Sequence, residues 1–130
     1  PDARHHGAYQ RSEIAARIAE ADWVVVPSVW WENAPLVIQE AFLQRRPVIT
    51  SGIGGMAEAV RDGIDGLHVP PDDPAALAEA MRRAAGEPEL WARLVRAIRP
   101  PPTPEQAAEA HLALYDGLLG RRRPRARRAA

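Results

Sequence analysis

Glu32 and Glu40 stand in the stretch PSVWWENAPLVIQEAF, with seven residues between them and mostly apolar neighbours. A carboxylate is costly to bury without a partner, so both side chains need an explanation. Three explanations are open: a solvated surface, an acid and base pair of the glycosidase type, and a grip on a bound ligand. Because nothing else in the sequence supports a glycosidase site, the choice lies mainly between the surface and the ligand.

A helix is predicted over residues 33–45, between and around the two glutamates. Pro35 falls in its first turn, where the missing N–H is no loss. The first free N–H groups would then belong to Ala34, Leu36 and Val37. Such groups form a site for phosphate at the positive end of the helix dipole.

Both glutamates are expected near this helix start. Glu32 precedes it, at the carboxyl edge of a predicted strand over 23–27, where ligands bind in open parallel sheets. Glu40 lies one turn above Leu36, and helical side chains lean back toward the N-terminus. One ligand could therefore place a phosphate on the N–H groups and hydroxyls on the two carboxylates. A sugar nucleotide has that distribution of groups.

Strands alternate with helices along the chain, which predicts a parallel α/β sheet. The strands are β-branched runs, as expected where a sheet is buried on both faces. Three strands are few for such a sheet, which suggests a piece of something larger. Strands are predicted over 23–27, 47–51 and 67–70, and helices from Ser12, over 33–45, over 56–61, from Asp73, over 88–98, and from Thr103 to about 119.

Composition restricts the class of protein. A chain of 130 residues suits one compact domain. It has no cysteine, which excludes disulfides and thiolate metal sites. No apolar run approaches the roughly 20 residues that cross a bilayer. We therefore expect a soluble, cytoplasmic protein.

Charge is distributed unevenly. All seventeen cationic residues are arginines, and six of them lie in 121–128, so 1–120 keeps eleven against seventeen acidic residues. We expect 120–130 to be a disordered tail, because its arginines repel one another and Pro124 interrupts structure. Besides a solvated end, this tail could contact an anionic membrane surface at its inner face, or attract nucleic acid without specificity.

Two other kinds of site, for a dinucleotide and for a metal, are less consistent with the sequence. The stretch GIGGMA, residues 52–57, fits a dinucleotide fingerprint, but the helix after it is short and a tight turn explains the glycines better. Asp73, which would be the acidic partner, is better explained as a helix cap before Pro74. The four histidines show no ligand spacing, and no D-x-D pair occurs, so no metal is expected.

These stretches together resemble a known enzyme family. ADWVVVPSVWWENAPLVIQEAF, followed by RPVITSGIGGMAEAVRDGIDGLHVPPDDPAALAEAM, is similar to the C-terminal nucleotide-binding domain of the family 4 (group 1) retaining glycosyltransferases, which have the GT-B fold. The resemblance covers roughly residues 7–119. It implies a Rossmann-like parallel sheet with flanking helices, and a partial donor-binding domain over 1–119. The implied activity is transfer of a hexose from a nucleotide sugar to an unidentified acceptor.

The resemblance also implies roles for individual residues. Glu40 would bind the ribose hydroxyls of the donor, and Glu32 would contact hydroxyls of the donor sugar at the catalytic centre. Tyr9 would lie beside the base. The donor would be a UDP-, GDP- or ADP-hexose, without any cofactor. The backbone groups expected to line the sugar and diphosphate belong to Asn33, Ala34, Pro35, Leu36 and Val37.

The sequence departs from the family in two respects. Arg45 stands where the family usually has a glycine that ends the helix in the left-handed conformation, so the helix is expected to end differently. The family's Arg and Lys that neutralise the leaving diphosphate, and its N-terminal acceptor domain, lie upstream of the matching region. We therefore expect the chain to be inactive alone, to need that domain as a partner, and to self-associate through exposed sheet edges.

Two alternatives to the transferase stay open from the sequence. One is a noncatalytic nucleotide-binding or assembly module. The other is a dinucleotide-binding oxidoreductase domain built on the glycine motif. Binding of nucleoside diphosphates, compared with binding of NAD, separates them.

Overall fold

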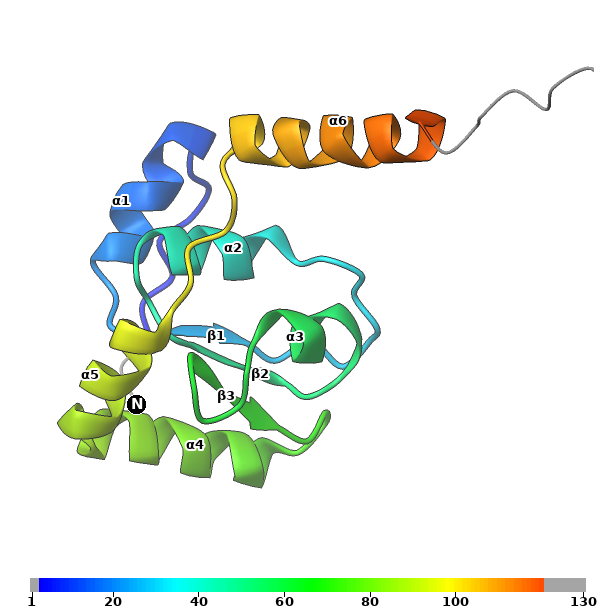
Figure 1. The fold of residues 1–130 in the computed structure, drawn as a ribbon. Coiled ribbons are helices and arrows are strands. Elements are labelled where there is room, and N and C mark those ends of the chain that lie inside the picture. The colour runs from blue at the N-terminus through cyan, green and yellow to red at the C-terminus, as the bar shows by residue number, and fades with distance from the viewer. Residues whose placement is uncertain (1–2, 121–130) are drawn as a thin grey trace, which may run out of the picture.

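The computed structural model describes residues 3–120 and shows a three-stranded parallel sheet (Figure 1). Its strands are β1 (Val24–Val26), β2 (Val48–Ser51) and β3 (Gly66–Val69), in the spatial order β1-β2-β3. In the register, Val25 lies opposite Ile49, and Ile49 lies opposite Leu67. The three predicted strands are confirmed, each within one residue at either end.

Helices cover both faces of the sheet (Figure 1). Residues of α1, α2 and α3 pack on one face, and residues of α4 and α5 pack on the other. The helical elements are η1 (Arg11–Glu13), α1 (Ile14–Ala19), α2 (Leu36–Leu43), α3 (Gly54–Ala59), α4 (Pro74–Gly86), α5 (Pro88–Ala97) and α6 (Pro104–Gly120).

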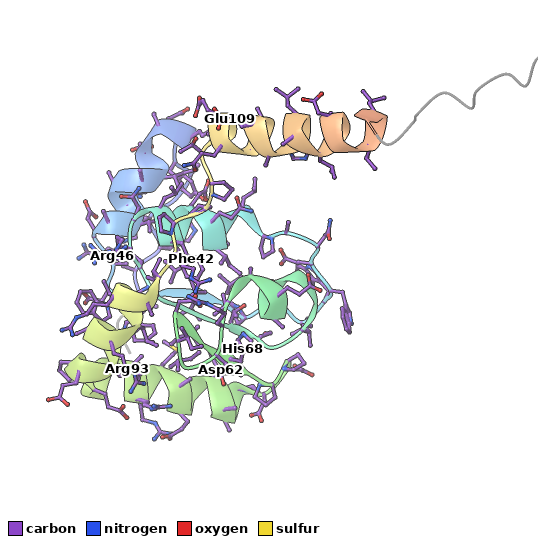
Figure 2. The ribbon with its side chains drawn as sticks, in the orientation of Figure 1. Phe42, Arg46, Asp62, His68, Arg93 and Glu109 are labelled. Carbon is purple, nitrogen blue, oxygen red and sulfur yellow. The ribbon has the colours of Figure 1, made fainter. Side chains whose placement is uncertain are left out.

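Two apolar layers hold these elements together. Successive residues of a strand point to opposite faces, so Val48 of β2 joins the layer under α2 while Ile49 joins the layer under α4 and α5. Phe42 extends from α2 into the first layer (Figure 2), and Leu94 of α5 is fully buried in the second. Burial on both sides explains why the strands are continuous β-branched runs.

Three predicted helix starts need correction. The first helix begins with a short 3-10 turn whose N-cap is Gln10 instead of Ser12, and Glu13 accepts a bond from the Gln10 N–H. Helix α2 begins at Leu36, and Pro35 is its N-cap with an extended ψ of 111°. The residue before a proline is disfavoured in helical conformation, which keeps Ala34 out of the helix. The extended ψ of Pro35 then delays the start of α2 to Leu36. Helix α3 spans Gly54–Ala59, two residues earlier than predicted.

The expected change at the end of α2 was wrong. Arg45 adopts the left-handed conformation that glycine usually supplies, with φ 56°. Its N–H donates to the Phe42 carbonyl at 3.0 Å, and the Arg46 N–H donates to the Ala41 carbonyl at 2.9 Å, which closes the helix end. The Arg45 guanidinium also donates to the Val95 carbonyl at 3.0 Å, in the last turn of α5. This long-range bond offsets the strain of a left-handed arginine.

Helix α6 extends away from the sheet and its covering helices (Figure 1). Between Pro104 and Leu119 its residues are exposed, apart from the half-buried Ala107. Within residues 3–120, no helix is both long enough and apolar enough to cross a membrane. The Arg-rich segment 121–130, expected to be disordered, lies outside the described residues.

Candidate functional site

The candidate site lies where β1 ends and α2 begins. The loop 27–35 leaves the carboxyl end of β1, passes beside α3 and enters α2 (Figure 1). This loop carries Glu32, and the second turn of α2 carries Glu40. The carboxyl edge of a parallel sheet is the edge at which such folds bind ligands.

The N-terminal end of α2 is open. Its N-cap is Pro35, which is buried and provides no side-chain acceptor. The Ile38 N–H already donates to the Pro35 carbonyl at 3.1 Å. The N–H groups of Leu36 and Val37 have no partner within the helix, and Leu36 is 64% exposed. These two groups are the ones that the sequence predicts to receive a phosphate, whereas Ala34 precedes the helix and does not belong to its first turn.

Glu32 is half-buried and held in place at two points. The Ser28 hydroxyl donates to Glu32 Oε1 at 2.5 Å. The Glu32 backbone carbonyl accepts from the Gly55 N–H of α3 at 2.7 Å. One carboxylate oxygen is therefore engaged by Ser28, which leaves Oε2 to accept a further hydrogen bond.

Glu40 has a different environment. It is half-buried on α2, next to Ala41 and Phe42 of the apolar layer. Among the side-chain hydrogen bonds and ion pairs of residues 3–120, none involves the Glu40 carboxylate. A half-buried carboxylate without a protein partner is a candidate acceptor for ligand hydroxyls.

Tyr9 lies close to the first turn of α2. Tyr9 and Val37 line one pocket of about 340 Å³, together with apolar residues of α1 and β1. The Arg17 guanidinium lies over the Tyr9 ring, 5.6 Å from its centroid. The structure thus places Tyr9 and Val37 on the wall of the same pocket. The other two loop residues of the prediction, Asn33 and Ala34, are exposed.

The structure gives the glycine motif a contact that the sequence reasoning missed. Gly54 and Gly55 lie inside α3, and a Cβ on Gly55 would be 1.8 Å from the Asn33 carbonyl oxygen. The loop that carries Glu32 therefore lies directly against this glycine, and no dinucleotide phosphate could approach it there. Two adjacent glycines after a buried strand were the available signal, since glycine permits such close backbone approach.

Polar groups elsewhere have structural partners. The Asp73 carboxylate caps α4 by accepting from the Ala76 N–H at 2.9 Å, as predicted. His68 Nε2 lies 2.8 Å from the Val60 carbonyl oxygen. Within residues 3–120, no three His, Asp or Glu side chains gather in an arrangement that could hold a metal ion.

Comparison with known proteins identifies the family. Residues 2–87 match the family described as Glycosyl transferases group 1. The chain belongs to this family. It is 38% identical over 96 residues to glycogen synthase of Mycobacterium tuberculosis, covering 74% of the chain and 23% of that enzyme. It is 34% identical over 127 residues to D-inositol 3-phosphate glycosyltransferase of Streptomyces griseus, covering 95% and 27%.

Two solved structures share the fold. Sucrose-phosphate synthase from Thermosynechococcus elongatus matches with a TM-score of 0.73 at 32% identity, over 88% of this chain and 29% of that one. Anabaena HepE in complex with UDP-glucose matches with a TM-score of 0.67 at 23% identity, over 85% and 30%. The predicted Rossmann-like sheet of a GT-B domain is confirmed. The chain spans about a quarter of the length of the two curated relatives, the glycogen synthase and the D-inositol 3-phosphate glycosyltransferase.

Proposed function

We propose that this chain is the donor-binding part of a retaining glycosyltransferase that transfers a hexose from a nucleotide sugar to an acceptor. The observation that carries the proposal is the open N-terminus of α2, with Glu32 before it and Glu40 one turn above it. The two free N–H groups suit a diphosphate, and the two carboxylates suit hydroxyl groups. A sugar nucleotide carries both kinds of group.

Each part of the site would have one task. The N–H groups of Leu36 and Val37 would bind the phosphates. Glu40 would accept hydrogen bonds from the ribose, and Glu32 Oε2 from the sugar being transferred. Tyr9, beside Val37, would contact the base. By fixing the donor in this way, the chain would orient the anomeric carbon for transfer and stabilise charge as the diphosphate leaves.

The relatives support this donor class. The structural match from Anabaena was solved with UDP and with UDP-glucose, and the curated relatives include a glycogen synthase. We therefore propose a UDP-, GDP- or ADP-hexose as donor. The curated relatives, a glycogen synthase and a D-inositol 3-phosphate glycosyltransferase, are named for different acceptors or products, so the proposal leaves the acceptor open.

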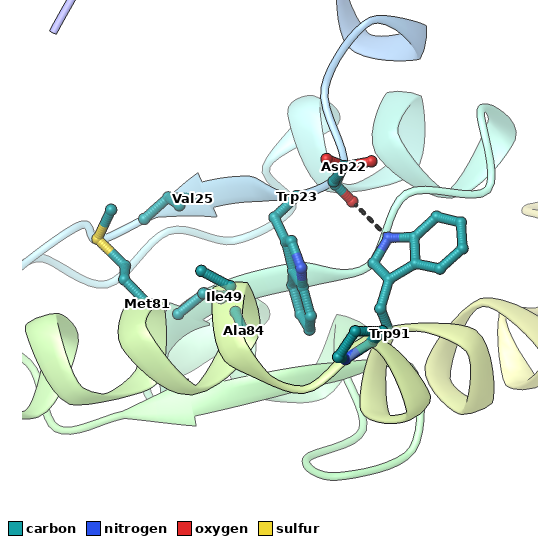
Figure 3. Close-up of a pocket in the computed structure, with 9 residues that line it drawn as sticks. Asp22, Trp23, Val25, Ile49, Met81, Ala84 and Trp91 are labelled. Carbon is teal, nitrogen blue, oxygen red and sulfur yellow. Dashed lines mark hydrogen bonds between the residues drawn. The ribbon is translucent and has the colours of Figure 1, made fainter. Parts of the chain in front are cut away.

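A second domain is part of the same proposal. Strand β1 pairs only with β2 among the described strands, and Trp23 and Val25 beside its free edge are half-buried. These two residues line a mainly apolar pocket of about 490 Å³ with Met81, Ala84 and Trp91, whose indole N–H donates to the Asp22 carbonyl at 2.9 Å (Figure 3). We propose that the first part of this same domain covers this edge and supplies the cations that neutralise the leaving diphosphate. An acceptor-binding domain would precede it.

The location of the protein is a further part of the proposal. Nucleotide sugars are made inside cells, and the arginines of 121–128 would attract an anionic membrane surface. We therefore propose work in the cytoplasm, at the inner face of the membrane. Sedimentation of the chain with vesicles that contain anionic lipid, compared with neutral vesicles, tests the membrane contact. Equal sedimentation with both would contradict it.

The central test is a calorimetric titration of the chain with UDP, GDP, ADP, the corresponding glucose conjugates and NAD. We expect one nucleoside diphosphate to bind and its sugar conjugate to bind more tightly. Glu40→Ala should weaken both, by about tenfold or more because two hydroxyls lose a charged acceptor. Glu32→Ala should mainly remove the extra affinity of the sugar conjugate over the nucleoside diphosphate. Glu79→Ala, on the exposed face of α4, is the matched control.

The outcomes separate the candidate functions. Binding of NAD without any nucleoside diphosphate would contradict the transferase and favour an oxidoreductase domain. Equal, negligible effects of the two glutamate variants would return both residues to the solvated surface. Binding without transfer, even after the upstream domain is supplied in the longer protein, would favour a noncatalytic module. Transfer by the 130-residue chain alone would contradict the proposed dependence on a second domain.

A further inference from the structure

We propose that Ser28 and Gly55 are positioning residues for Glu32, and that they fix its carboxylate toward the sugar of the donor. The inference rests on the proposed function for the role of Glu32, but the contacts themselves are independent of any ligand. Glu32 lies in an irregular loop, where a side chain has no fixed direction unless other groups supply one. Gly55 supplies it from α3, and Ser28 supplies it from the start of the same loop, directly after β1.

Gly55 fixes the backbone of the loop. Its N–H donates to the Glu32 carbonyl oxygen at 2.7 Å. A Cβ on Gly55 would stand 1.8 Å from the Asn33 carbonyl oxygen and 2.8 Å from that of Glu32, closer than Cβ atoms approach in proteins. Any side chain at this position must therefore push the loop away from α3.

Helix α3 is a firm reference for this contact. Met56, next to Gly55, is fully buried in the layer under α2. Gly54 adds a second, looser contact, since its Cβ would be 3.1 Å from both the Glu32 carbonyl oxygen and the Trp31 ring. The loop is thus more easily displaced than the helix.

Ser28 fixes the carboxylate itself. It follows β1 closely, and its hydroxyl donates to Glu32 Oε1 at 2.5 Å. This bond selects one rotamer of Glu32 and leaves Oε2 free. Transfer depends on sub-ångström placement of the groups around the sugar. The loss of the Ser28 or the Gly55 hydrogen bond should therefore weaken binding of the sugar more than binding of the nucleotide.

The test uses Gly55→Ala, Gly54→Ala and Ser28→Ala in the full 130-residue chain. The first readout is the ratio of affinities for a glucose conjugate and its nucleoside diphosphate. Gly55→Ala should lower this ratio by about tenfold, on the order of one lost charged hydrogen bond, with little change for the nucleoside diphosphate. Gly54→Ala and Ser28→Ala should lower it less, and Ser28→Thr should restore it. Gly86→Ala, where an added Cβ meets nothing within 4 Å, is the control.

The second readout needs no ligand. Fluorine NMR of chain labelled with 5-fluorotryptophan reports on the loop through Trp30 and Trp31, and on the packed sheet through Trp23 and Trp91. In Gly55→Ala, only the two loop resonances should shift. If that variant does not fold, Gly54→Ala brings a smaller clash, but it also strains the backbone, because Gly54 has φ 53°. Its loop shifts therefore support the inference only where the Trp23 and Trp91 resonances stay in place.

The outcomes are distinguishable. If no wild-type nucleotide sugar binds, the proposed function fails, and the spectra alone decide whether the glycines place the loop. Loop resonances that stay unchanged in folded Gly54→Ala and Gly55→Ala would overturn the inference. So would an unaltered affinity ratio, or a Ser28→Thr variant that behaves like Ser28→Ala.

Discussion

The two ends of α2 differ in how their backbone groups are satisfied. At the C-terminal end, the carbonyls of Glu40, Ala41 and Phe42 accept from following N–H groups, and Arg45 and Arg46 close the turn. At the N-terminal end, Pro35 provides no side-chain cap, and the N–H groups of Leu36 and Val37 have no partner within the helix. The C-terminal end of α2, called the structural end below, therefore has its backbone groups satisfied within the protein. The N-terminal end has N–H groups available for a ligand.

The structural end also fastens other elements. Arg45 donates to the Val95 carbonyl of α5, and Arg46 donates to the Ala19 carbonyl of α1 at 2.5 Å. Both bonds place a cation at the C-terminal end of another helix, where the helix dipole favours positive charge. At the start of α2, by contrast, the N-cap residue makes no side-chain hydrogen bond to the helix. We infer that substitutions at the two ends should separate stability from binding.

The largest expected effect comes from removing an apolar side chain that packs the whole of α2 against the sheet. Ile38 is fully buried under the centre of α2, so Ile38→Ala should lower the free energy of unfolding by about 2–5 kcal/mol. The affinity for nucleotide should also fall, because α2 loses a packing contact that holds it against the sheet. Urea unfolding measures the change. Leu43→Ala, on the same helix but 56% exposed, is the control and should stay within about 0.5 kcal/mol. Similar losses in both variants would contradict the assigned burial.

The next effect concerns the open end alone. Pro35→Asn would add a side chain able to cap α2, and its oxygen would compete with phosphate for the same N–H groups. Nucleoside diphosphate affinity should fall about fivefold, the equivalent of a cap worth about 1 kcal/mol. Pro35→Ala loses the same buried ring without adding an acceptor, so it serves as the control in the same titration. Equal affinities of the two variants would show that the phosphates bind elsewhere.

The difference between these ends also marks the limit of prediction from sequence. Local patterns were sufficient for the strands, for the Asp73 cap of α4, and for a helix that starts near Thr103. At that start the structure forms a capping box between Thr103 and Gln106, with bonds in both directions. Local patterns were also sufficient to place Glu40 one turn into a helix. Each of these features depends on residues that are near in sequence.

Features that depend on distant contacts were missed. The left-handed Arg45 is stabilised by a carbonyl fifty residues away, and local preference for glycine predicted a different end. The Gly55 contact with the Glu32 loop joins segments separated by a strand. The late start of α2 belongs to neither group, because Pro35 was recognised but placed inside the first turn instead of before it.

A smaller effect should distinguish the backbone strain of Arg45 from the stabilisation that its bonds to α5 provide. Arg45→Ala keeps the left-handed backbone and loses the bonds to α5, so we expect a loss of about 1 kcal/mol. Arg45→Gly loses the same bonds but relieves the strain, and should stay within about 0.5 kcal/mol of the wild type. Thermal unfolding measures both variants. Nucleotide binding should be unchanged in each, and a glycine variant less stable than the alanine variant would contradict this account.

The smallest effect concerns a helix start that, unlike that of α2, is closed by a side chain. The Gln10 N–H donates to the Glu13 carboxylate at 2.6 Å, and this backbone bond, with Arg17 nearby, lowers the pKa of Glu13 below its ordinary value. A lowered folded pKa adds stability above the unfolded pKa, and this stability disappears as the pH falls through the folded value. Glu13→Gln keeps an acceptor but cannot titrate, so the wild type should be slightly more stable near pH 7 and lose that margin below about pH 4.3, the usual pKa of a glutamate. Unfolding curves of both proteins from pH 7 to pH 3 test this, and a margin that does not change with pH would mean that the charge of Glu13 plays no part in closing the helix.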